Sequence, residues 1–295
     1  MEQTLNSEKR LTGLIKQELA EDIKNYGDKR RSPIAVREEA KVLEQTTKVA
    51  DEPMTVILSD KGWVRAGKGH DIDPMTLLYK AGDGYKAHVK TRSNEQVVFL
   101  DSNGRSYSLT VHDLPSVRGY GDPLTAHLTP ESGAEFTALL GGSAEQKVLL
   151  MADSGYGFIV PYEELVSKNR KGKGIINLST GAKLLPAALL PAAVEPKNLL
   201  LAIFSNDARL LIIPMDSIPE MAKGKGKKLF NNKESVVMAV ACMPKKATLT
   251  LSVGKKEVTL AGEELQHYIG EAGQRGSKLP KNMQKEGLSI QVNGL

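Results

Sequence analysis

The sequence predicts an all-β fold of five repeats, each about 52 residues long, in a propeller-like array preceded by one amphipathic helix. Three observations support this fold class. Short glycine units recur at an even spacing, an aliphatic run and a tight turn stand before each unit, and helical periodicity is confined to the N-terminal segment. A unit of this length cannot bury a core alone, so the repeats must pack against one another.

The N-terminal segment has the pattern of an amphipathic helix. Ser7 is a good N-cap, and Gly27 stands where a helix C-cap is expected. Apolar residues between them fall on one helical face: Leu11, Leu14, Ile15, Leu19, Ile23 and Tyr26. We therefore assign residues 1–34 to a helical segment, 35–52 to a linker, 53–282 to the repeats and 283–295 to a tail.

The repeats are defined by glycine units. Their first glycines lie at positions 67, 119, 172, 224 and 276, at intervals of 52, 53, 52 and 52 residues. The units are Gly67-Lys68-Gly69, Gly119-Tyr120-Gly121, Gly172-Lys173-Gly174, Gly224-Lys225-Gly226 and Gly276-Ser277-Lys278. Chance does not produce such spacing, so each unit marks one repeat.

A β-hairpin is expected in each repeat. The turns are rich in Asn, Asp, Ser and Gly, which tolerate positive φ, and they separate aliphatic runs. The runs before the turns are Thr55–Leu58, Val97–Leu100, Val148–Met151, Leu199–Phe204 and Thr248–Leu251. Further strands are expected at Tyr85–Val89, Glu135–Leu140 and Val236–Ala241, which would give four strands per repeat.

Composition limits the classes of function. A single cysteine, Cys242, excludes an intramolecular disulfide and a cysteine-rich zinc site. The start of the chain is polar, and the most apolar stretch, Lys183–Phe204, is interrupted by prolines and charges, so we expect a cytoplasmic protein without a membrane span. The chain has 40 basic and 35 acidic side chains, and Met221–Lys285 alone has 13 against 5. This local excess favours a polyanionic partner.

Basic residues flank the glycine units. Lysine and arginine neutralise phosphates and release counterions, and glycine lets the main chain approach a phosphate closely. The candidate DNA-binding residues are Arg65, Lys68, Arg118, Arg170, Lys171, Lys173, Lys223, Lys225, Lys227, Lys228, Arg275 and Lys278. The alternative for any one of them is an ordinary solvated surface residue, but their recurrence in all five repeats favours a shared function.

Other constellations have simpler interpretations. His70, Asp71 and Asp73 are interpreted as capping or solvated residues rather than a metal site. The pairs Glu163-Glu164 and Glu263-Glu264 are interpreted as turn residues, because they occupy equivalent positions in their repeats. Trp63 begins the strand after a turn, so we interpret it as part of the core rather than a base-stacking platform. No set of nucleophile, base and oxyanion donor stands out, and no P-loop is present.

Several segments resemble one family over nearly the whole chain. They are Ile15–Leu19, Tyr26–Ser32, Leu58–Arg65, Lys68–Asp73, Asp101–Tyr107, Asp153–Phe158 and Met221–Gly226. They are similar to the C-terminal domain of the A subunits of bacterial type IIA topoisomerases, in particular those of the topoisomerase IV type. A gyrase signature in the first blade is reduced here to Arg65, Gly67, Lys68 and Gly69, which favours the topoisomerase IV type.

The resemblance implies a five-bladed β-pinwheel in which neighbouring blades exchange a strand and duplex DNA bends around a basic rim. It implies that the N-terminal helix ends a coiled-coil arm and that the DNA-cleaving tyrosine lies in a part absent from this chain. Mg²⁺ and ATP would be used by other domains and the B subunit, so the chain itself needs no cofactor. Implied partners are bacterial condensin, the B subunit, which acts with an A-subunit homodimer, and DNA at the nucleoid. The alternative is a protein-interaction scaffold whose basic rim binds an acidic partner.

Overall fold

The computed structural model describes residues 7–28, 51–192, 194–231, 234–253, 256–281 and 288–293, with the side chains of 253, 256 and 288–293 left aside. The chain divides into two compact units, Met1–Thr47 and Lys48–Leu295. Most of the predicted linker, residues 35–50, lies outside the described residues. No helix of the described segments is long and apolar enough to cross a bilayer.

The first unit contains the predicted helix, α2 (Glu8–Tyr26). Ser7 occupies the N-cap position, and the Gly27 N–H donates to the Ile23 carbonyl at 2.9 Å. A Cβ on Gly27 would lie 2.2 Å from that carbonyl oxygen, so glycine is required where the chain leaves the helix. The apolar face is solvent-exposed in this unit, with exposed fractions from 46% at Leu14 and Ile15 to 84% at Tyr26.

The second unit is an array of five antiparallel sheets, four of them with four strands and the fifth with three among the described residues. In spatial order the sheets contain β3 (Tyr85–Arg92), β1 (Pro53–Ser59), β2 (Trp63–Lys68) and β6 (Asp122–Pro123); β10 (Lys173–Gly174), β5 (Arg105–Thr110), β4 (Gln96–Asp101) and β7 (Phe136–Leu140); β11 (Ala188–Leu189), β8 (Lys147–Met151), β9 (Tyr156–Pro161) and β14 (Lys227–Lys228); β15 (Val237–Pro244), β12 (Leu199–Ser205), β13 (Arg209–Pro214) and β18 (Ser277–Lys278); and β17 (Lys256–Leu260), β16 (Thr248–Val253) and β19 (Leu288–Asn293).

Each sheet is built on a predicted hairpin. In the first, Leu58 pairs with Val64 across a turn in which Gly62 has a φ of +77°. Gly104 and Gly155 have the same left-handed conformation in the next two turns, and Ala208 has it in the fourth. The additional strands expected near residues 85, 135 and 236 are β3, β7 and β15. The hairpin prediction is therefore confirmed.

Short helical turns connect the strands. They are η1 (Pro74–Thr76), η2 (Val111–Asp113), α3 (Leu124–His127), α4 (Tyr162–Leu165), η3 (Pro196–Asn198), η4 (Met215–Ser217) and α5 (Glu263–Gln266). The pairs Glu163-Glu164 and Glu263-Glu264 lie in α4 and α5, as expected of turn residues.

Each of the first four sheets receives its last strand from the following repeat. These exchanged strands are β6, β10, β14 and β18, which pair with the second hairpin strands β2, β5, β9 and β13. A glycine with positive φ precedes each of them: Gly121, Gly172, Gly226 and Gly276. Three residues after each of these glycines comes a buried anchor: Leu124, Ile175, Leu229 and Leu279.

The exchanged strands revise the alignment of the repeats. The equivalent glycines are at 121, 172, 226 and 276, at intervals of 51, 54 and 50 residues, so the even spacing of first glycines combines two different positions. Gly67 lies within β2 and belongs to no exchanged strand. The number of repeats predicted from the sequence is correct, but the structural unit is the glycine that begins an exchange.

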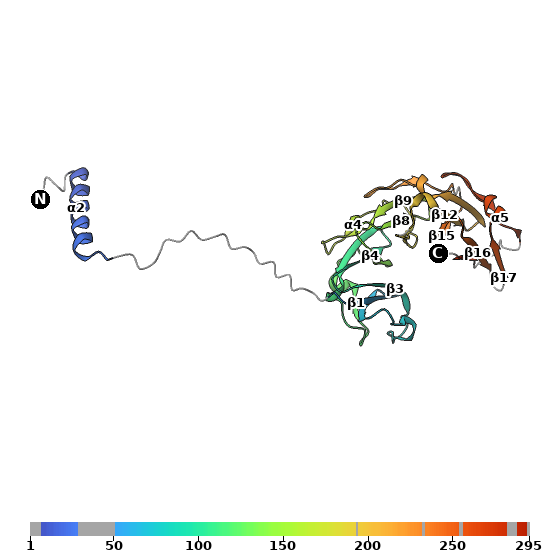
Figure 1. Cartoon of the computed structure of the whole chain (residues 1–295), viewed down its shortest axis with the longest axis horizontal. Coiled ribbons are helices and arrows are strands. Elements are labelled where there is room, and N and C mark those ends of the chain that lie inside the picture. The colour runs from blue at the N-terminus through green and yellow to red at the C-terminus, as the bar shows by residue number, and fades with distance from the viewer. Residues whose placement is uncertain are drawn as a thin grey trace. The chain divides into compact units, whose positions relative to one another are not determined.

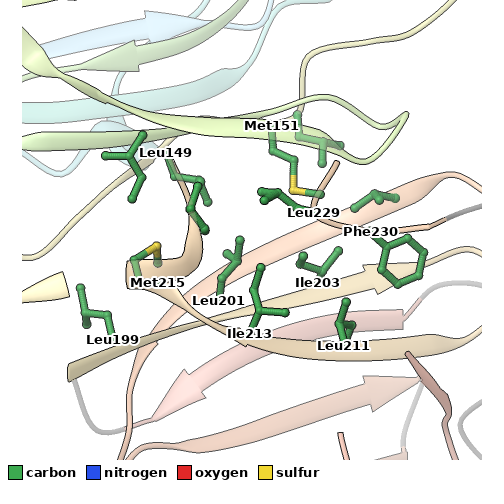
Figure 2. Close-up of a cluster of buried hydrophobic side chains, with 14 of the residues drawn as sticks. Leu149, Met151, Leu199, Leu201, Ile203, Leu211, Ile213, Met215, Leu229 and Phe230 are labelled. Atoms are coloured by element: carbon green, nitrogen blue, oxygen red, sulfur yellow. The ribbon is translucent and has the colours of Figure 1, made fainter. Parts of the chain in front are cut away.

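The core consists of four clusters, one between each pair of successive sheets. Figure 2 shows the cluster between the third and fourth sheets, where Leu149 and Met151 of β8 point toward Leu201 and Ile203 of β12. No cluster among the described residues joins the fifth sheet to the first. Within this unit the sheets follow one another along an open arc, from β1 and β3 to β16 and β17 (Figure 1).

The last sheet is completed by the C-terminal segment. We assigned residues 283–295 to a tail, but β19 pairs with β16 from Leu288 to Asn293. Within the described residues this sheet receives no exchanged strand, and β19 occupies the position of β3, β7, β11 and β15 in the other sheets. The fifth sheet therefore extends beyond the predicted boundary at residue 282.

Candidate nucleic-acid interface

The glycines that begin the exchanged strands are required by packing. Gly172 has a φ of +68°, and a Cβ there would lie 2.6 Å from a Tyr107 ring carbon and 2.7 Å from the Ser106 carbonyl oxygen. At Gly226 the corresponding distance to the Gly157 carbonyl oxygen is 2.4 Å. By contrast, a Cβ on Gly119 or Gly174 would meet nothing within 4 Å. Strand exchange, rather than approach to a phosphate, thus accounts for the recurring glycines.

The twelve candidate DNA-binding residues separate into two groups by exposure. Eight are exposed: Lys68, Arg118, Arg170, Lys171, Lys223, Lys225, Lys227 and Lys278. The other four, Arg65, Lys173, Lys228 and Arg275, are buried or half-buried. The sequence could not separate the groups, because the same flanking position points outward in one repeat and toward a neighbouring strand in another.

Arg65 is directed into the protein. It is 3% exposed, one guanidinium nitrogen donates to the Gly119 carbonyl at 2.8 Å, and its Cζ lies 4.7 Å from the centre of the Tyr79 ring. Arg65 therefore fastens the exchange loop of the second repeat to the first sheet. Its burial argues against the predicted contact with DNA. Nearby, Lys68 is exposed but forms an ion pair with Glu52 at 2.7 Å.

Trp63 and the acidic residues of the first repeat have local structural roles. Trp63 is half-buried, and the Lys80 ammonium lies 3.4 Å from its ring centre. Asp73 caps η1 by accepting from the Met75 N–H at 2.9 Å, and His70 Nε2 lies 3.1 Å from the Thr91 carbonyl oxygen. Among the described residues no group of three potential metal ligands occurs.

At the second sheet, the basic residues are held by neutral or acidic partners. Arg170 donates to the carbonyls of His127 and Ala126 at 2.6 and 2.7 Å, and the Lys173 ammonium contacts the Glu164 carboxylate at 2.9 Å. Lys171 is exposed, and its carbonyl accepts from Arg105 at 3.0 Å. Of the three candidates here, Lys171 has the side chain best placed to meet a phosphate.

At the fourth sheet, Asp207 neutralises two arginines. Its carboxylate accepts from Arg275 at 3.0 Å and from Arg209 at 3.1 Å, and the Ser205 hydroxyl donates to it as well. Partial burial raises the pKa of Asp207, but the hydrogen bonds from Ser205, Arg275 and Arg209 outweigh it and lower the pKa below its ordinary value. Arg275 is therefore compensated within the fold, whereas Lys278 remains exposed.

The exchange loop on the third sheet concentrates positive charge. Lys223, Lys225 and Lys227 are exposed, Lys228 is half-buried, and the three exposed lysines form no ion pair with a described residue. Lys225 and Lys228 lie over the ring of Tyr156, with their ammonium nitrogens 4.2 and 5.0 Å from its centre. The equivalent loop of the second repeat has a single basic residue, Arg118, and also contains an acidic one at position 122.

Residues that the charge pattern missed contact these loops from the sheets. They occupy one position, the first residue of the second hairpin strand: Trp63, Arg105, Tyr156 and Arg209. Arg105 and Arg209 donate to carbonyls of the exchange loop, whereas Tyr156 presents its ring to lysines. A signal existed in the sequence, because each of these residues directly follows the turn.

Comparisons with known proteins agree on the class. The profile of the family described as "DNA gyrase C-terminal domain, beta-propeller" matches residues 146–190 and 200–237. The solved structure of the Escherichia coli ParC C-terminal domain is 40% identical, with a TM-score of 0.74 over 81% of this chain and 99% of that one. A solved C-terminal domain of DNA topoisomerase IV that is 15% identical shares the fold, with a TM-score of 0.66.

Longer relatives extend the match to nearly the whole chain. The A chain of DNA topoisomerase 4 from Pseudomonas aeruginosa is 44% identical over 289 residues, and that of Escherichia coli K12 is 43% identical over 280. These matches cover 95% and 92% of this chain but only 38% and 37% of the relatives. The all-β pinwheel fold expected from the sequence is thus confirmed. The chain belongs to the family of C-terminal domains of topoisomerase IV A subunits.

Proposed function

We propose that this chain is a non-catalytic module that binds and bends duplex DNA without strong sequence preference. The observation that carries the proposal is the loop on the third sheet, where Lys223, Lys225 and Lys227 are exposed together without a described carboxylate partner. Such a surface binds the DNA backbone through neutralised phosphates, a contribution that carries no sequence information.

The open arc supports bending. Exchange loops recur on four successive sheets, and Lys171, Lys223, Lys225, Lys227 and Lys278 are exposed on three of them. A duplex that follows several of these loops must curve with the array, and the energy of bending is offset by the added phosphate contacts. In the full-length protein, this module would favour particular crossings of DNA during ATP-dependent decatenation and relaxation at the nucleoid.

The family suggests how the module works in a larger assembly. We infer that Mg²⁺, ATP and the DNA-cleaving tyrosine belong to the B subunit or to other parts of the A subunit. The A subunit would form a homodimer. Bacterial condensin is a candidate protein partner.

Titration against salt tests DNA binding. Fluorescence anisotropy with a labelled duplex of about 30 base pairs, repeated between about 50 and 300 mM NaCl, should give a slope of log K against log salt steeper than about −3, since each phosphate contact contributes about −0.9. Two duplexes of unrelated sequence should give similar values. A flat salt response, or no binding at the lowest salt concentration, would reject the proposal and favour the alternative of a scaffold for an acidic protein.

A further inference from the structure

We propose that Tyr156 is a positioning residue that converts two flexible lysines of the third sheet into a fixed phosphate clamp. This inference rests on the proposed DNA binding and specifies where the backbone is held most firmly. Tyr156 begins β9 and pairs directly with Lys228 of the exchanged strand β14. Its ring is thus placed by the sheet rather than by a loop.

The ring gathers two positive charges. Lys225 Nζ and Lys228 Nζ lie 4.2 and 5.0 Å from its centre, so their separation cannot exceed the sum of these distances. An ammonium over an aromatic face is attracted by the ring quadrupole. Two ammonium groups held this close repel each other, and a phosphate between or beside them relieves that repulsion.

The main chain restrains the same lysines. Lys228 Nζ also donates to the Ser154 carbonyl at 3.3 Å, and the strand that carries Lys227 and Lys228 pairs with Tyr156 and Gly157. Leu229, one residue further on, is fully buried and anchors the strand. Ordering a lysine side chain on DNA costs conformational entropy, and this cost is smaller when the side chain is already restrained.

The equivalent positions of the other sheets lack this arrangement. Arg105 and Arg209 fill the position in the second and fourth sheets, and each forms an ion pair with a carboxylate, that of Glu131 or Asp207. In the first sheet Trp63 contacts a lysine of the loop before β3 rather than one of an exchange loop. Among the four sheets that receive an exchanged strand, the third alone combines, in its described residues, an aromatic ring with lysines of that loop.

The experiment compares Tyr156→Leu, which removes the ring, with Tyr156→Phe, which keeps it. Tyr156→Leu should weaken binding of a labelled duplex by about three- to tenfold at about 100 mM salt and make the salt slope shallower by about one unit. Tyr156→Phe should restore both values. Tyr120→Leu, which removes an exposed tyrosine from the neighbouring exchange loop, is the matched control and should bind like the parent.

A double-mutant cycle separates positioning from a merely structural role. In a Lys225→Ala/Lys228→Ala background, Tyr156→Leu should have no further effect on affinity, because the ring acts through these lysines. The inference is overturned if Tyr156→Leu binds like the parent, if Tyr156→Phe fails to restore binding, or if Tyr156→Leu weakens binding equally in both backgrounds. Failure of the parent chain to bind any duplex would instead refute the proposed function.

Discussion

Replacing Gly172 by alanine should destabilise the array strongly, whereas replacing Gly174, two residues further along the same exchanged strand, should not. Gly172 has a φ of +68°, and an L-residue in the left-handed region costs about 1–2 kcal/mol. The added Cβ would also lie 2.6 Å from the ring of Tyr107 and 2.7 Å from the Ser106 carbonyl oxygen.

The neighbours of Gly172 cannot easily give way. Tyr107 is fully buried, its hydroxyl donates to Asp101 at 2.8 Å, and its ring packs edge-on against Phe136. Overpacking at such a site costs about 1–3 kcal/mol, so the total loss should be about 2–5 kcal/mol. Gly174 has open space around its Cβ position and an ordinary φ, and its replacement should change stability by less than about 0.5 kcal/mol.

Urea denaturation followed by circular dichroism measures both variants, and hydrogen exchange over Arg105–Thr110 reports whether loss begins at β5. The same pair tests the hypothesis drawn from the sequence, that these glycines admit a phosphate to the main chain. That hypothesis predicts weaker DNA binding by Gly174→Ala at unchanged stability. The strand-exchange explanation is refuted if Gly172→Ala is as stable as the parent, or if Gly174→Ala is the more damaging change.

Three further predictions concern charge and chemistry. Replacing Lys223, Lys225, Lys227 and Lys228 by alanine should make the salt slope shallower by about three units on any duplex sequence, and Arg118→Ala should change it by about one unit or less; equal effects of the two variants would contradict the special role of the third sheet. Asp207 has a lowered folded pKa, so its contribution to stability is complete above the unfolded pKa near 3.8 and is lost as the pH falls through the folded value; Asp207→Asn should therefore reduce the acid sensitivity of urea midpoints, and an unchanged pH profile would count against the arginine network. The chain alone should leave supercoiled plasmid intact with Mg²⁺ and ATP present, as gel electrophoresis would show, and relaxation by the purified chain would contradict the non-catalytic assignment.

Local information in the sequence was sufficient for the secondary structure. The turn around Gly104, the hairpins and the helix between Ser7 and Gly27 follow from φ preferences and from hydrophobic periodicity, which act within a few residues of the chain. The number of repeats and the family were also accessible, because both are written in recurring residues. The concentration of lysines at Lys223–Lys228 was visible from the composition of that segment alone.

Only the tertiary structure decided what each recurring residue does. Gly172 and Gly174 are alike in sequence, yet the first contacts Tyr107 of a strand about 65 residues earlier and the second faces open space. Arg65, Arg275 and Lys225 all flank glycines, but their partners are the Gly119 carbonyl, the Asp207 carboxylate and the Tyr156 ring. These partners come from other repeats because the strands are exchanged, and a contact between distant repeats leaves no trace in the local pattern that identifies a basic loop.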